Sequence, residues 1–273
     1  MRILAIEAST EASSVALMNG TEVIFRMQDS GRSQAEGLLA WVRALLAESG
    51  TALAELDAIA ASVGPGAFTG VRVSVAVAQG LAFGADLPVV PVMTLETLAY
   101  HALAEQLAAG SAGGTAPAGA GVRYALPCLD ARMGEVYWGC FAADARRGVC
   151  LEGRAAVGQP ATVALPAAHG SAAAGAPAPS ATGEPSPAAL VASARDGRRY
   201  RAIGRGFSVY PELARIPGVQ LQAEDALRLP HAADLAALAA LRAAAGEAID
   251  PADLSPVYLR DKVAFTEAER AGK

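Results

Sequence analysis

The residues best suited to chemistry lie in a glycine-dense stretch, where Gly64, Gly66 and Gly70 follow an apolar run and Pro65 fixes one more backbone angle. Thr69 is a suitable N-cap for a helix that would follow. Such a strand-turn-helix junction directs free N–H groups and the positive end of a helix dipole outward, which suits a phosphate or another anion. Neither a Gly-Lys-Ser/Thr ending nor the Gly-x-Gly-x-x-Gly spacing is present. The stretch therefore predicts either an anion site or a tight structural turn.

The elements before this stretch predict a three-stranded meander. Residues 2–8, 14–18 and 22–27 are the strands, and Asn19-Gly20 is a hairpin turn between the last two. The first two strands are joined by the hydroxyl-rich residues 9–13, which predict either a turn with local backbone hydrogen bonds or a phosphate contact.

An amphipathic helix is predicted over residues 34–48, ended by Gly50. Leu38, Val42 and Leu45 mark its apolar side, and Trp41 widens that side beyond what one neighbour needs. An aromatic residue in this position indicates either core packing or a helix-helix interface.

A second helix is predicted to begin after Gly70, although residues 71–77 alternate with the period of a strand. As a helix, this segment is apolar on two opposite faces, so it requires either two neighbours, one of them a second chain, or burial inside one larger domain. We predict that both helices contact a partner, through the residues Leu38, Trp41, Val42, Leu45, Val71, Ser74, Val75, Ala78 and Ala82.

Strands then alternate with helices, which predicts an α/β protein with parallel strands added to the meander. Residues 110–121 are nearly all Ala, Gly, Ser, Thr and Pro and predict a connection between lobes. We expect an N-terminal lobe over 1–109 that carries the two helices, and a C-terminal lobe over 122–273. A low-complexity insertion is expected within the second lobe at about 167–194.

The composition limits the function. A formal charge of −5 is unfavourable for a chain that must itself bind nucleic acid, because phosphate contacts supply most nucleic-acid affinity. No uninterrupted apolar run of membrane-spanning length and no signal-peptide layout are evident, so we expect a cytoplasmic protein without membrane contact. Three cysteines without a Cys-x-x-Cys pair read as reduced residues.

Five short motifs resemble the TsaB (YeaZ) family of tRNA threonylcarbamoyladenosine biosynthesis subunits, and the resemblance covers nearly the whole chain. They are the opening residues 3–10, the glycine-rich stretch 64–82, residues 94–99, residues 130–137 and the closing Pro-Val-Tyr-Leu-Arg at 256–260. The resemblance implies a two-lobed actin-like ATPase (ASKHA) fold with mixed sheets flanked by helices.

The resemblance also implies a function and partners. It implies a non-catalytic scaffold subunit that binds the catalytic subunit TsaD, which modifies adenosine 37 to N6-threonylcarbamoyladenosine in tRNAs that read ANN codons. It further implies that the ATPase TsaE resets the assembly, that a homodimer forms when TsaD is absent, and that tRNA is contacted through the complex. We expect no catalytic residue, metal or cofactor of its own, with ATP or ADP, if any is bound, at the interface with TsaD.

The alternative is a stand-alone small ATPase or kinase of the actin-like fold. In that fold, Thr10 and Ser13 stand where phosphates are held, and both are weak cofactor-binding candidates. Asp130 would hold a nucleotide or metal and the Gly204–Gly206 turn would cradle adenosine. Asp130 beside a turn with Arg132 is also typical of a hydrogen-bonded structural contact.

Overall fold

The first of two five-stranded sheets contains the predicted meander. The computed structural model describes residues 1–28, 34–111, 123–166 and 198–260. The strand order is β3-β2-β1-β4-β5, with β1 to β3 antiparallel and β4 and β5 parallel to β1. The strands are β1 (Arg2–Glu7), β2 (Ser13–Asn19), β3 (Glu22–Gln28), β4 (Ala58–Ser62) and β5 (Val89–Val92).

The second sheet repeats this layout. Its order is β10-β9-β6-β7-β8, again with a three-stranded antiparallel meander followed by two parallel strands. The strands are β6 (Tyr124–Arg132), β7 (Glu135–Asp144), β8 (Gly148–Gly158), β9 (Tyr200–Ile203) and β10 (Val219–Leu221). This duplication confirms the actin-like α/β fold.

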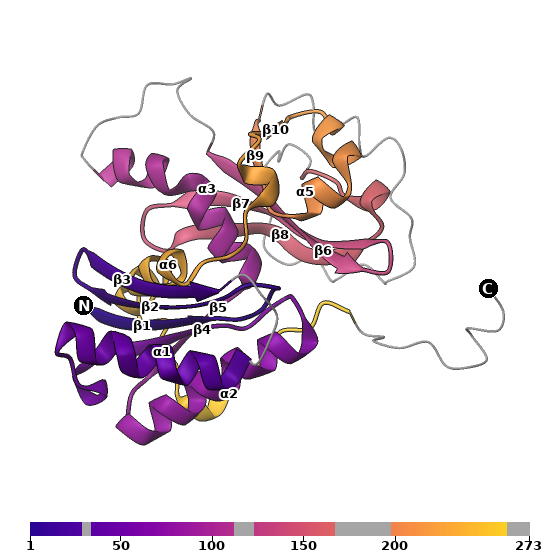
Figure 1. Cartoon of the computed structure of the whole chain (residues 1–273). Coiled ribbons are helices and arrows are strands. Elements are labelled where there is room, and N and C mark those ends of the chain that lie inside the picture. Colours follow the sequence, from indigo (N-terminus) through magenta and orange to yellow (C-terminus); the bar gives the residue numbers. More distant parts are fainter. Residues whose placement is uncertain (29–33, 112–122, 167–197, 261–273) are drawn as a thin grey trace, which may run out of the picture.

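Helices cover both faces of the first sheet (Figure 1). On one face lie α1 (Gln34–Ser49) and α2 (Phe68–Ala85), and α6 (Ala232–Ala244) packs against the other. The helix α3 (Thr94–Ser111) packs on α6 and on strands of the second sheet, and the short α5 (Gly206–Val209) follows β9. One apolar cluster therefore joins the two sheets through α3 and α6, and another fills the space between the first sheet and α1 and α2.

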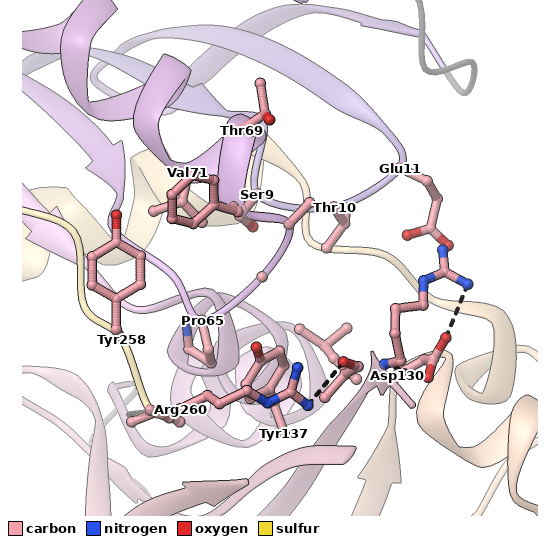
Figure 2. Close-up of a pocket in the computed structure, with 18 of the residues that line it drawn as sticks. Ser9, Thr10, Glu11, Pro65, Thr69, Val71, Asp130, Tyr137, Tyr258 and Arg260 are labelled. Carbon is pink, nitrogen blue, oxygen red and sulfur yellow. Dashed lines mark hydrogen bonds and ion pairs between the residues drawn. The ribbon is translucent and has the colours of Figure 1, made fainter. Parts of the chain in front are cut away.

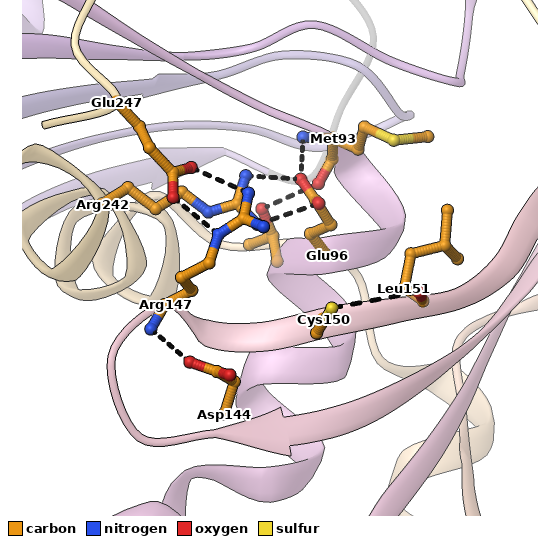
Figure 3. Close-up of polar contacts among 9 residues, drawn as sticks. Met93, Glu96, Asp144, Arg147, Cys150, Leu151, Arg242 and Glu247 are labelled. Carbon is orange, nitrogen blue, oxygen red and sulfur yellow. Dashed lines mark hydrogen bonds and ion pairs between the residues drawn. The ribbon is translucent and has the colours of Figure 1, made fainter. Parts of the chain in front are cut away.

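An ion-pair network lies where α3, α6 and the β7–β8 turn meet (Figure 3). Arg242 on α6 donates two hydrogen bonds to Glu96 on α3, at 2.9 and 2.8 Å, and both side chains are largely buried. Arg147 in the turn pairs with Glu247 at 2.6 Å. The Arg242–Glu96 pair links elements from opposite halves of the chain, and the Arg147–Glu247 pair ties the β7–β8 turn to the segment after α6.

The helix α2 corrects one expectation. It begins at Phe68 with Ala67 as N-cap and no side-chain cap, so Thr69 is not the cap. By length and composition α2 could cross a membrane, but Arg72 and Gln79 interrupt its apolar sequence, so the expectation that no uninterrupted apolar run reaches this length is unchanged. Only about a third of it is buried, because one apolar face packs on the sheet and the other does not.

The predicted insertion at 167–194 lies outside the described residues, as does most of the predicted connection at 110–121. The division into lobes over 1–109 and 122–273 stays a prediction. The helix α6, from the second half of the sequence, packs against β1 and β2 of the first sheet.

Candidate functional site

A cleft of about 840 Å³ collects the segments that the sequence singled out (Figure 2). It is bounded by the hydroxyl-rich turn, the glycine-dense stretch with the start of α2, the β6–β7 hairpin and the C-terminal segment. In residue numbers, the lining segments are 9–11, 65–71, 129–132 and 257–260. Residues distant in sequence thus meet at one place, as expected for a protein of this fold.

The glycine-dense stretch is held by close backbone packing. The N–H of Ala67 donates to the carbonyl oxygen of Ser9 at 2.7 Å. A Cβ atom on Gly66 would lie 2.0 Å from that same oxygen, which no side chain tolerates. The glycine at 66 is therefore required for structure, and the turn seats the first turn of α2 at the cleft.

Of the two cofactor-binding candidates in the hydroxyl-rich turn, one lines the cleft and the other does not. Thr10 lines the cleft, and its buried Oγ1 has no hydrogen-bond partner among the described residues. Ser13 is buried at the start of β2 and lies outside the cleft lining. Behind them, Ser9 donates to Glu7 through its amide at 2.7 Å and its hydroxyl at 2.5 Å. Burial raises the pKa of Glu7 above its ordinary value, and these hydrogen bonds oppose that shift.

The charged groups of the cleft are paired within the chain. Asp130 accepts a hydrogen bond from the backbone N–H of Arg132 at 2.9 Å, and the guanidinium of Arg132 lies 3.1 Å from the same carboxylate. Arg205 pairs with Glu11 across the cleft. This arrangement matches the structural interpretation of Asp130.

The Gly204–Gly206 turn also packs closely, in this case against Cys128. A Cβ on Gly204 would lie 2.4 Å from the carbonyl oxygen of Cys128, and one on Gly206 would lie 2.6 Å from the Cys128 sulfur. Of these residues only the intervening Arg205 lines the cleft. Among the described residues, no group of three or more His, Cys, Asp or Glu side chains is placed to bind a metal ion.

The C-terminal segment forms one wall of the cleft. The sequence did not predict this position for the segment. The N–H of Val257 donates to Val63 at 2.7 Å, and Arg72 on α2 donates to the Tyr258 hydroxyl at 2.9 Å. Arg260 pairs with Glu135 in the β6–β7 hairpin. The only sequence signal for this wall is the closing motif at 256–260, which indicates family membership and not contacts.

The predicted partner-contact residues require a correction. Trp41 is half-buried, and the other side chains are buried against the chain's own sheet, so they cannot form the contact surface of a folded monomer. The buried ones are Leu38, Val42, Leu45, Val71, Ser74, Val75, Ala78 and Ala82. The outer face of α2 instead carries exposed or half-buried small and apolar residues, namely Val73, Ala76, Val77, Gly80, Phe83 and Gly84. On α1 the exposed positions include Ala40, Arg43, Ala44 and Ala47.

Two duplicated sheets, a cleft between them and a glycine turn seating α2 define an actin-like two-lobed protein. The family model for TsaD, tRNA N6-adenosine threonylcarbamoyltransferase, matches residues 28–268. Over 265 residues, or 97% of both chains, the sequence is 33% identical to the tRNA threonylcarbamoyladenosine biosynthesis protein TsaB of Escherichia coli. It is 39% identical to TsaB of Haemophilus influenzae over half of each chain. The chain therefore belongs to the TsaD-related family of threonylcarbamoyladenosine proteins and, within it, to TsaB (YeaZ).

Solved structures agree with this assignment. YeaZ from Pseudomonas aeruginosa superimposes with a TM-score of 0.72 at 35% sequence identity, covering 94% of this chain and 99% of that one. A second crystal structure from the same organism, described as similar to peptidase YEAZ, gives a TM-score of 0.73 at 35% identity. The resemblance to the TsaB family is confirmed, and with it a place in tRNA threonylcarbamoyladenosine biosynthesis.

Proposed function

We propose that this chain is a non-catalytic subunit that binds TsaD through the outer faces of α1 and α2. In this proposal TsaD transfers the threonylcarbamoyl group to N6 of adenosine 37 in tRNAs that read ANN codons, and TsaE resets the complex. The same helix faces form a homodimer when TsaD is absent. Any ATP or ADP lies at the interface with TsaD, and the complex acts in the cytoplasm.

The observation that carries the proposal is the unpartnered outer face of α2. An 18-residue helix of high mean hydropathy, only a third buried, exposes a stripe of small residues flanked by Phe83, which is 60% exposed. The adjacent outer face of α1 is rich in alanine. Small residues allow two helices to approach closely, and an exposed aromatic residue supplies an anchor.

The chemistry of the cleft supports a non-catalytic role. The described residues that line it include no histidine or cysteine, and its carboxylates Glu11 and Asp130 are each engaged by an arginine. Burial raises the pKa of the Cys128 and Cys140 thiols well above the ordinary value, which disfavours the nucleophilic thiolate at either position. The charge of −5 is consistent with tRNA being held by another subunit.

One specific feature favours the alternative, a small ATPase. The unpartnered Thr10 hydroxyl and the uncapped start of α2 border the same cleft. A phosphate there would meet the positive end of a helix dipole, with the buried Thr10 hydroxyl behind the cleft surface.

Size-exclusion chromatography of this protein with TsaD from the same organism separates the two functions, with ATP hydrolysis assayed on isolated and combined fractions. Co-elution together with no hydrolysis by the isolated chain supports the subunit. Independent elution, with hydrolysis by this chain alone that is lost in Asp130→Ala, would identify an enzyme instead.

A further inference from the structure

The outer edge of the first sheet is a regular, unpaired strand. All seven residues of β3 pair with β2 without a register shift, and within the described part of the chain no strand pairs with the other edge of β3. Such an edge presents a row of free N–H and C=O groups that can pair with another strand. Proteins usually protect such an edge with proline, a bulge or an inward-pointing charge, and the described β3 has no proline and no bulge.

Large apolar side chains are exposed along this edge. Val23, Phe25 and Met27 alternate along one face of β3 and are 37%, 48% and 42% exposed. Phe25 meets the ring of His231, at the start of α6, edge-on with centroids 4.6 Å apart. This apolar stripe therefore continues the face of the sheet on which α6 lies.

The backbone groups of the same three residues point away from the sheet. Asn19 and Glu22 close the two-residue turn between β2 and β3, and in such a hairpin the closing pair exchanges both hydrogen bonds. Hydrogen-bonded and non-hydrogen-bonded pairs then alternate along the ladder. The N–H and C=O groups of Val23, Phe25 and Met27 are thus directed to the free edge. The Phe25 carbonyl oxygen there accepts a hydrogen bond from the Arg26 guanidinium at 2.9 Å, and its second lone pair remains for a partner strand.

We propose that β3 pairs antiparallel with β3 of a second copy of this chain, about a two-fold axis that passes through Ile24. In this register Glu22 lies opposite Arg26 of the second copy, and the symmetry makes this ion pair twice. Val23 likewise lies opposite Phe25 of the second copy, a favourable pairing of a β-branched with an aromatic side chain. A two-fold axis through Phe25 would instead place Ile24 opposite Arg26 and Glu22 opposite Gln28, with no charge pair.

Arg26 is able to make the new contact without losing its present contacts. It pairs with Glu48 on α1 at 2.5 Å and also donates to the Phe25 carbonyl oxygen at 2.9 Å, and its side chain is 42% exposed. A guanidinium has five N–H donors, so it can bind a second carboxylate from the opposite strand. This surface is separate from the outer faces of α1 and α2, and the inference does not depend on the proposed binding of TsaD.

Disulfide trapping tests the register. In a Cys150→Ser background, which removes the one exposed cysteine, Ile24→Cys would place two thiols opposite each other in a non-hydrogen-bonded pair. Mild oxidation should give a covalent dimer on a non-reducing gel. Val23→Cys is the matched control, because it faces Phe25 of the second copy and should remain monomeric. Equal trapping of both variants, or none, would overturn the proposed register.

Sedimentation velocity tests the interface itself. Glu22→Arg places like charges opposite each other twice and should weaken self-association about tenfold. The double variant Glu22→Arg, Arg26→Glu should restore it, and Phe25→Lys should weaken it independently. Circular dichroism confirms that each variant is folded. A wild-type chain that is monomeric at all concentrations, or self-association unaffected by these changes and abolished by a charge on the outer face of α2, would refute the proposal.

Discussion

Replacing Gly80 by arginine should have opposite effects on the stability of the monomer and on its affinity for TsaD. Gly80 lies in the interior of α2 on its outer face, and a Cβ added there would meet no atom within 4 Å. Glycine in a helix interior is about 1 kcal/mol less favourable than alanine, and arginine ranks close to alanine. The variant monomer should therefore be about 0.5–1 kcal/mol more stable than the wild type.

Binding to TsaD should change in the opposite direction. Gly80 lies in the middle of the exposed stripe, where the absence of a side chain permits the closest approach of a partner helix. Arginine would hold the helices apart and bury a charge without a partner at the centre of the contact. Central contacts of this kind are worth at least about 2 kcal/mol, so the affinity should fall at least about thirtyfold.

The assay is a titration of TsaD by calorimetry, together with urea unfolding of each variant alone. Ala108→Arg is the matched control, because it adds the same side chain at an exposed position of another helix, α3. Gly80→Ala should bind with nearly unchanged affinity while gaining the helix stability. Wild-type affinity in Gly80→Arg would refute the assignment of the partner surface, and a loss of monomer stability would show that this face is already occupied within the chain.

Three further substitutions test the internal structure. Gly66→Ala should cost about 3 kcal/mol or more in urea unfolding, because the new Cβ would overlap the Ser9 carbonyl oxygen, and a cost under about 1 kcal/mol would contradict the close approach. Glu96→Ala should cost about 3–5 kcal/mol by leaving the buried Arg242 unpaired, which thermal unfolding would detect, whereas a neutral effect would place the pair in solvent. Because the folded-state pKa of Glu7 is raised, the folded chain binds more protons than the unfolded chain between the two pKa values, so stability falls as the pH rises from about 4.5. That component of the pH slope should vanish in Glu7→Gln, and an identical slope in both proteins would argue against burial of the charge.

Strong local signals made the first half of the fold predictable. The turn at Asn19-Gly20 and the apolar runs beside it specify β2 and β3, which were predicted over 14–18 and 22–27 and span Ser13–Asn19 and Glu22–Gln28. The strand β8, however, was not predicted. It lies at a sheet edge, is interrupted by Gly153, and has half-buried or exposed residues over most of its length, so no alternation of apolar and polar residues marks it.

The sequence predicted the two helices and not the side chains that remain accessible. On α2 the apolar residues occupy both faces, so periodicity alone does not determine which face packs on the sheet. The most conspicuous apolar residues, such as Val75 and Leu45, lie against the sheet, and the small residues between them face outward. A charge at Val75 or Leu45 would consequently unfold the chain and would not test binding.

The helix α2 connects the cleft to the proposed partner surface. Its start is fixed by the contact between Gly66 and Ser9, and Gln79 holds the C-terminal segment through bonds to Pro251 and Leu254 at 2.9 and 3.0 Å. A glycine-dense turn is needed for this seating even though the charges of the cleft are paired within the chain. The sequence left open whether this turn is an anion site or a tight structural turn. The placement of α2, whose outer face is the proposed site of TsaD binding, is a sufficient physical reason for the structural turn.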